Sequence, residues 1–196
     1  MTKTTAGLIV MMAVWTAGTA TRSDAASAPD SVVVLHVTNS AHVSAGDLAE
    51  AERVATRVYA EAGVRAVWTE GTAWHAQPDG AFHADVLLLS KEMVTLKSQV
   101  DGLDEHVFGS ALPPIRRAYI FDNRIADHAR MTDSNFALLL GMVIAHEVGH
   151  LLLPASSHSA AGIMCTQWER RTAGLLTFTR DQGTTIRQRL AARSAN

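Results

Sequence analysis

The sequence predicts an α+β fold, a small mixed twisted sheet with helices packed against it, in a single domain spanning residues 31–196. Three observations support this prediction. Strand and helix patterns follow one another as β, α, β, β in the first half. A long apolar segment around residue 140 has the length of a buried helix, and a last capped helix follows it. The 196 residues are 47% apolar and 18% charged, as in a globular domain.

The first half of the domain contains three predicted strands and one helix. Residues 31–37 are rich in β-branched side chains, which is typical of a buried strand. Residues 44–62 place apolar side chains at helical spacing between a capping serine and a glycine stop. Residues 64–69 and 84–90 have the composition of the second and third strands.

An edge segment and a further strand come next. Residues 107–114 are predicted as a short edge segment, because Gly109 suggests a bulge and Pro113 and Pro114 cannot donate to a ladder. Residues 116–125 are predicted as the strand that follows.

Two helices complete the predicted domain. The first covers residues 133–153, is apolar around most of its circumference, and ends before Pro154. The second starts with a capping box formed by Thr179 and Gln182 and ends before Ser194. No repeat and no linker to a second domain is evident in the sequence.

The N-terminal 30 residues have the pattern of an export signal. Lys3 precedes a short apolar run, and small residues lead to Ala20. We therefore expect a signal peptide over residues 1–20, with Ala28 as the alternative cleavage site, and a spacer over 21–30. The run is too short for a stable membrane span, although an uncleaved anchor is the alternative. The expected location is secreted or periplasmic.

Composition excludes several classes of site. The net charge is −2 and Lys and Arg do not cluster, which disfavours nucleic-acid binding. The single cysteine, Cys165, excludes an intramolecular disulfide and a multi-thiolate zinc site, and we interpret it as an inert buried thiol. A metal would therefore need histidine and carboxylate ligands. The sequence does not indicate the oligomeric state.

The motif AHEVGH, within the predicted helix over 133–153, carries the strongest chemical signal. His146 and His150 are four residues apart, so both imidazoles project from one face of a helix and can share one zinc ion. Glu147 lies beside them, where it can act as general base on a metal-activated water. The alternative is a buried polar trio, which would need partners to offset its desolvation.

The string HEVGHLLLPASSHSAAGIM resembles the metzincin superfamily of zinc peptidases. The metzincin motif is HExxHxxGxxH, followed by a methionine-containing turn beneath the metal. The resemblance implies that His158 is the third zinc ligand and that Met164 lies in the Met-turn. The chain departs from the motif, because Leu153 replaces its glycine and Ser156 its third histidine, with His158 two residues later. A longer loop must therefore carry His158 back to the metal.

The resemblance also implies the arrangement of the domain. A metzincin-like fold has an HExxH active-site helix, a Met-turn and a C-terminal helix below a mixed sheet. The segment from Gly109 to Pro114 is similar in place to the metzincin edge strand that receives an extended peptide by backbone pairing. An ordinary proline-capped loop is the alternative there.

These observations predict a zinc metallopeptidase, most simply an endopeptidase, that hydrolyses peptide or protein substrates. One alternative is a gluzincin-type site, in which Glu169 is the third ligand. Another is an exported zinc-binding domain without catalytic activity. The remaining histidines, including His36, His83 and His106, show no ligand spacing and are interpreted as surface or singly hydrogen-bonded groups.

Overall fold

The fold is described from a computed structural model, for residues 31–71, 81–166 and 175–194. The predicted signal peptide and spacer lie outside these ranges, as does Glu169. Within the described residues, no helix combines the length and the apolar character that crossing a membrane requires.

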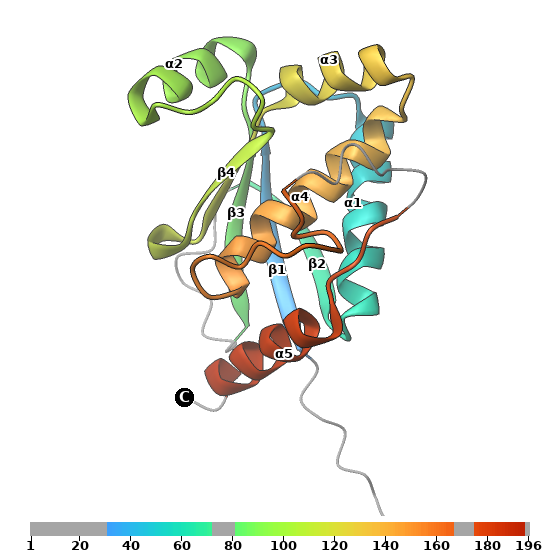
Figure 1. Cartoon of the computed structure of the whole chain (residues 1–196), viewed down its shortest axis with the longest axis vertical. Coiled ribbons are helices and arrows are strands. Elements are labelled where there is room, and N and C mark those ends of the chain that lie inside the picture. The colour runs from blue at the N-terminus through green and yellow to red at the C-terminus, as the bar shows by residue number, and fades with distance from the viewer. Residues whose placement is uncertain (1–30, 72–80, 167–174, 195–196) are drawn as a thin grey trace, which may run out of the picture.

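A five-stranded mixed sheet in the order β2-β1-β3-β5-β4 forms the centre of the domain (Figure 1). The first four strands in this order are parallel, and β4 joins the edge antiparallel to β5. The strand bounds are β1 Val32–Asn39, β2 Arg65–Glu70, β3 Phe82–Leu88, β4 Gly109–Leu112 and β5 Arg117–Ile120. A mixed sheet with packed helices agrees with the α+β prediction.

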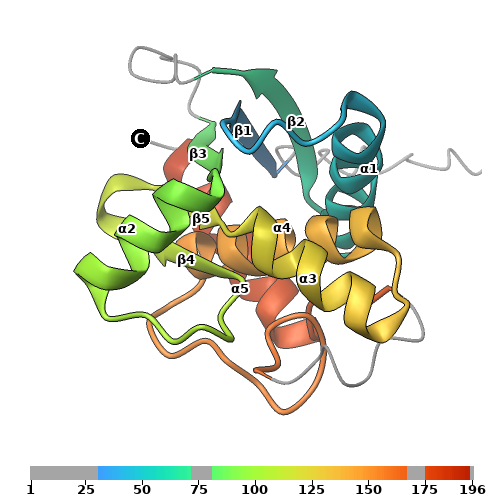
Figure 2. The ribbon, with the colours of Figure 1, turned by 90° about the horizontal axis from the view of Figure 1, so that it is seen from above.

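Helices α1 and α4 lie side by side on one face of the sheet, as Figure 2 shows from above. α5 closes one end of the sheet, and α2 and α3 lie at the other end (Figure 1). The helix bounds are α1 Ala45–Glu61, α2 Lys91–Asp101, α3 Asp122–Thr132, α4 Phe136–Leu152 and α5 Arg180–Ser194. A 3-10 turn, η2 Pro113–Ile115, separates β4 from β5.

Close packing of α1 against α4 depends on a glycine. A Cβ on Gly141 of α4 would lie 2.5 Å from the carbonyl oxygen of Ala51 and 2.6 Å from Cβ of Val54, both in α1. One turn further along, the hydroxyl of Tyr59 donates to the carbonyl oxygen of Ala145 at 3.0 Å. Tyr59 is fully buried, so this bond satisfies a hydroxyl that water does not reach. The contact fixes α4 immediately before His146.

Two parts of the sequence prediction are wrong. The strand predicted over 116–125 ends at Ile120, and α3 begins at Asp122. Helix α2 was not predicted, because its apolar residues do not mark a buried face: Val94 is its only fully buried residue, while Leu96 and Val100 are exposed. The local signals of α2 are instead its caps, Ser90 at the start and Gly102, in the left-handed region, at the end.

The third strand is displaced from its predicted position. It covers Phe82–Leu88 instead of 84–90, and Ser90 caps α2 by accepting a hydrogen bond from the backbone N–H of Met93. The other predicted elements are confirmed to within a few residues, including the capping box of α5. There, the N–H of Thr179 donates to Gln182 and that of Gln182 donates to the Thr179 hydroxyl.

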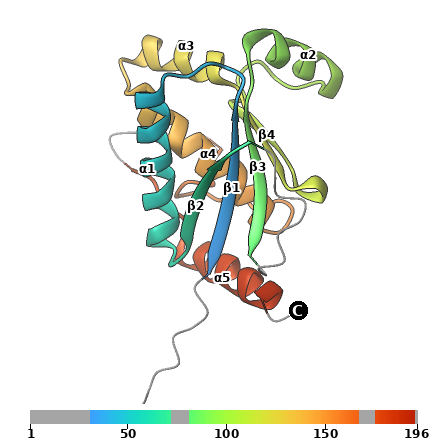
Figure 3. The ribbon, with the colours of Figure 1, turned by 180° about the vertical axis from the view of Figure 1, so that it is seen from behind.

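A row of polar side chains crosses the sheet on the face opposite α1 and α4, the face seen in Figure 3, and its central residues, His36 and Asp85, are buried. Strand register aligns Thr69, His36, Asp85 and Arg117 on four neighbouring strands. Thr69 Oγ1 lies 2.8 Å from His36 Nδ1, and Arg117 donates to Asp85 at 3.0 Å. The other ring nitrogen of His36 lies 3.0 Å from Nδ1 of His83. The interpretation as a surface or singly bonded group is wrong for His36, which is buried and has two partners, and His83 is buried as well.

This row predicts acid sensitivity of the fold. Burial, helped by the neighbouring His83, lowers the pKa of His36, while Asp85 opposes the shift. Below a pH of about 6.5, His36 binds a proton more readily in the unfolded chain than in the folded chain. The free energy of unfolding therefore falls as the pH drops below this value. For one proton, the free energy of unfolding changes by at most about 1.4 kcal/mol per pH unit.

The measurement is urea unfolding between pH 8 and pH 5 for the wild type and for His36→Gln, which reaches His83 but does not titrate. We expect the variant to be less stable at pH 8 and to show a shallower decline towards pH 5. Parallel pH profiles for the two proteins would contradict the role given to His36.

Candidate metal centre

Helix α4 brings the motif residues to the centre of the domain. It begins after Asn135, whose side chain accepts from the N–H of Leu138 at 2.8 Å, and it is buried along nearly its whole length. His146 is 9% exposed and Glu147 is 8% exposed, in a helix whose other buried residues are almost all apolar. The spacing of four residues places the two imidazoles together, with His146 Nε2 and His150 Nε2 3.1 Å apart.

The loop after α4 brings a third histidine to the same place. The helix stops at Leu153, and the chain reverses at Ser156, which has a left-handed φ of 61°. His158 then returns so that one ring nitrogen from each of His146, His150 and His158 lies within 4.8 Å of the others. His158 therefore belongs to the same cluster as the two histidines of the motif. Glu169 lies outside the described residues, so the structure does not place it.

Contacts to the outer ring nitrogens orient two of these histidines. His146 Nδ1 lies 2.7 Å from the carbonyl oxygen of Ile163, so it carries the proton of this hydrogen bond. His150 Nδ1 lies 3.1 Å from the hydroxyl of Ser157. Both Nε2 atoms consequently face the space shared with His158. Metal-binding histidines commonly use the second nitrogen in this way.

Burial sets the protonation of these side chains. It lowers the pKa of His146 to about 4, an effect that His158 increases and the bond to Ile163 opposes. Burial also lowers the pKa of His150 to about 4, with further contributions from the other two imidazoles. Both rings are thus neutral at pH 7, the form that coordinates a metal. Burial raises the pKa of Glu147 to about 8 in the metal-free chain.

A tight turn containing Met164 lies directly under α4. The N–H of Cys165 donates to the carbonyl oxygen of Gly162 at 3.2 Å, and Met164 is fully buried. A Cβ on Gly149 would lie 2.7 Å from the sulfur of Met164 and 3.0 Å from the ring of Phe178. The glycine within HEVGH therefore lets this turn approach the helix. Cys165 is free and buried, in agreement with its interpretation as a structural thiol.

Gly109 packs against Glu147, the predicted general base. A Cβ there would lie 2.6 Å from Cγ of Glu147, so only glycine leaves room for the carboxylate. The predicted bulge at Gly109 is wrong, because β4 pairs with β5 residue by residue from Gly109↔Ile120 to Leu112↔Arg117. The close approach of backbone to side chain, and not a bulge, explains this glycine.

A cavity of about 450 Å³ opens over the three histidines and Glu147. Residues 106–111, from β4 and the segment before it, form one wall. Pro154, Ala155 and His158 contribute from the loop after α4, and Cys165 and Thr166 from the turn. The imidazoles and the carboxylate are therefore accessible to a ligand of the size of a short peptide segment.

Gln182 of α5 forms hydrogen bonds to the residues immediately before and after His158. Its Nε2 donates to the carbonyl oxygen of Ser157 at 3.2 Å and to the hydroxyl of Ser159 at 3.1 Å. From the sequence, Gln182 was predicted only as a capping residue, and Ser157 was not predicted as a partner of His150. The bonds of Gln182 to Ser157 and Ser159 and the bond of Ser157 to His150 depend on the path of the loop after α4, which no local sequence pattern predicts. The C-terminal helix thus fixes the position of the third histidine.

Comparisons with known proteins give limited information. No protein-family model matches the sequence, and no curated protein is significantly similar to it. Among solved structures, the fold is similar to that of a zinc-dependent peptidase from Methanocorpusculum labreanum, with 12% sequence identity and a TM-score of 0.44. The match covers 80% of this chain and 99% of that chain. This similarity is too weak to assign a family or a function.

Replacement of Gln182 should weaken metal binding without removing a ligand. We expect Gln182→Met to raise the dissociation constant for zinc about tenfold, the lower end of the effect of residues that orient metal ligands. Competition with a chromophoric chelator measures this constant. Gln188→Met, at an exposed position of the same helix, is the matched control and should bind zinc as the wild type does. Equal affinities in all three proteins would show that Gln182 acts only as a helix cap.

Proposed function

We propose that the protein is a zinc-dependent peptidase of metzincin-like type, with His146, His150 and His158 as metal ligands and Glu147 as general base. One observation carries this proposal: one ring nitrogen from each of three imidazoles lies within 4.8 Å of the others, beside a buried carboxyl group and in the lining of an open cavity. A histidine cluster with a purely structural role does not require a cavity beside it. A hydrolytic site does require one, because the substrate must reach the reacting groups.

The donor set fits zinc. Three histidine nitrogens with a fourth position left open are the ligand set of many catalytic zinc sites. His146 and His150 have their outer nitrogens engaged by Ile163 and Ser157, which leaves Nε2 for the metal. No thiolate is among the three, and Cys165, which lines the cavity, is not a member of the cluster. When bound, zinc supplies Lewis acidity and positive charge, which acidify water, polarise a carbonyl group and favour an ionised carboxyl group nearby.

Glu147 is placed to move protons. Its carboxyl group lines the cavity next to the histidines, and Gly109 holds it from the opposite side. As a carboxylate, Glu147 accepts a proton from the attacking water, and as a carboxylic acid it returns the proton to the leaving amine. Because the side chain is only 8% exposed, bulk water does not compete for these transfers.

Strand β4 supports a peptide as the substrate class. Gly109, Ser110 and Ala111 line the cavity with their backbone at the sheet edge. An extended peptide can add to such an edge by main-chain hydrogen bonds and present a bond to the metal centre. Cleavage within a chain, and so endopeptidase activity, is part of the proposal because the cavity is open. Export of the enzyme is also proposed, from the N-terminal signal pattern alone.

Removal of the general base should abolish turnover but not metal binding. We expect Glu147→Gln to lower kcat at least about a hundredfold, the minimum usually supplied by general acid–base catalysis. The measurement uses quenched fluorescent peptides together with zinc content. Glu61→Gln, at the exposed end of α1, is the control and should be unaffected. Undiminished activity of Glu147→Gln would exclude the proposed mechanism.

Zinc content distinguishes the possible third ligands. We expect the purified wild type to contain about one zinc per chain by mass spectrometry, because the three histidines form a single set of ligands. His158→Ala should lose this zinc and Glu169→Ala should retain it. The reverse result would support the gluzincin-type alternative, and one retained zinc without hydrolysis of any peptide would support a non-catalytic zinc-binding domain.

A further inference from the structure

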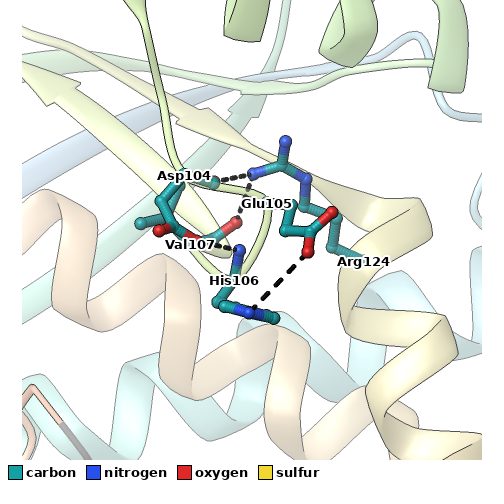
Figure 4. Close-up of polar contacts among 5 residues, drawn as sticks. All are labelled: Asp104, Glu105, His106, Val107 and Arg124. Atoms are coloured by element: carbon teal, nitrogen blue, oxygen red, sulfur yellow. Dashed lines mark hydrogen bonds and ion pairs between the residues drawn. The ribbon is translucent and has the colours of Figure 1, made fainter.

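Arg124 of α3 forms a clamp on the segment that leads into β4, as Figure 4 shows. Its Nη1 donates to the carbonyl oxygens of Asp104 and Val107, at 2.8 and 2.9 Å. Its Nη2 donates to the hydroxyl of Ser98 in α2, at 2.8 Å. The guanidinium also lies over the ring of Phe121, 5.0 Å from its centre. The planar fork of arginine suits such simultaneous contacts, and lysine cannot reproduce them.

Most of the clamped segment, residues 104–108, is exposed. The side chains of Glu105 and His106 are 85% and 84% exposed, and Val107 is 36% exposed. At the end of the segment, Phe108 is anchored: it accepts a hydrogen bond from the N–H of Phe121 at 2.9 Å, and its partly buried ring packs against the core and lies 5.1 Å from the ring of His128. Residues 104–107 lack such burial, so the contacts of Arg124 define their position.

The clamped segment forms a wall of the metal cavity. His106, Val107 and Phe108 line it, and the next residue, Gly109, packs against Glu147. The tolerance at Gly109 is small, because a single additional carbon atom there would overlap the carboxyl side chain. A displacement of the clamped segment would consequently move both the substrate wall and the backbone next to the general base.

The described lining of the cavity is poor in charged side chains. Apart from Glu147, the described lining residues include no Asp, Glu, Lys or Arg. Apolar side chains come from Val107, Phe108, Ala111 and Val143, among others. A charged side chain entering this cavity would lose hydration and, apart from Glu147, would meet no carboxylate, ammonium or guanidinium group among the described lining residues.

We propose that residues 106–108 are a substrate-binding wall positioned by Arg124, and that this wall selects peptides with an apolar side chain beside the scissile bond. The inference rests on the proposed peptidase function and extends it to substrate class. Arg124 is a positioning residue, since it contacts the wall and not the reacting groups.

The experiment compares two peptides that differ at one position beside the scissile bond, leucine in one and lysine in the other. We expect wild type to prefer the leucine peptide. Arg124→Lys and Arg124→Gln should retain zinc and lower kcat/KM for the leucine peptide about tenfold or more, since small misplacements at an active site have such effects. Arg130→Gln on the same helix, whose partner Asp127 is exposed, is the control.

Val107→Glu provides a test that does not depend on the folding of the Arg124 variants. It places a carboxylate on the exposed part of the wall, and it should shift the ratio of kcat/KM values towards the lysine peptide about threefold, the effect of a partly exposed ion pair. A purely structural role would not change this ratio.

Two results would overturn the inference: folded, zinc-loaded Arg124 variants with wild-type kcat/KM, or an unchanged peptide ratio in Val107→Glu. In both, zinc-dependent hydrolysis by the wild type would persist, so the proposed function would stand. Absence of zinc-dependent hydrolysis by the wild type would instead reject the proposed function, and this inference with it.

Discussion

Placement of polar side chains on an apolar, buried helix is the constraint around which the domain is organised. Helix α4 packs against the sheet beside α1, and it carries His146 and Glu147 where water has little access and His150 in a half-buried position. Desolvation of such groups costs free energy unless they have partners. The carbonyl oxygen of Ile163 and the hydroxyl of Ser157 offset part of this cost, and under the proposed function a cation bound by the converging nitrogens would offset more of it.

Glycines at three positions allow this arrangement to close. Gly141 brings α1 against α4, Gly149 admits the turn with Met164, and Gly109 admits the carboxyl group of Glu147. At each position a Cβ would approach another atom to between 2.5 and 2.7 Å. At Gly141 this atom is a backbone oxygen, and at Gly149 and Gly109 it belongs to the side chain of Met164 or Glu147, which would have to move. Sheet edge, helix and turn therefore pack closely around Glu147, and this packing restricts the positions of the polar groups.

Contacts between distant segments complete the site. α5 holds the loop of His158 through Gln182, and α3 holds the cavity wall through Arg124. Both residues lie on helices that contribute no atom to the metal centre. The helices at the two ends of the sheet consequently position the parts of the site that helix α4 cannot reach, and each does so by binding backbone carbonyls of an exposed loop.

The sequence alone determined what local spacing determines. Two histidines four residues apart share a helical face in any helix, and an apolar run ended by Pro154 predicts that helix, so His146, Glu147 and His150 could be grouped without a structure. His158 followed from its place just after the helix. The tertiary structure alone decided what depends on contacts between distant residues. These are the register that aligns His36 with Asp85, the contact of Gly109 with Glu147, and the hydrogen bonds of Arg124 to the segment before β4. Local periodicity carries no information about partners that only folding brings together.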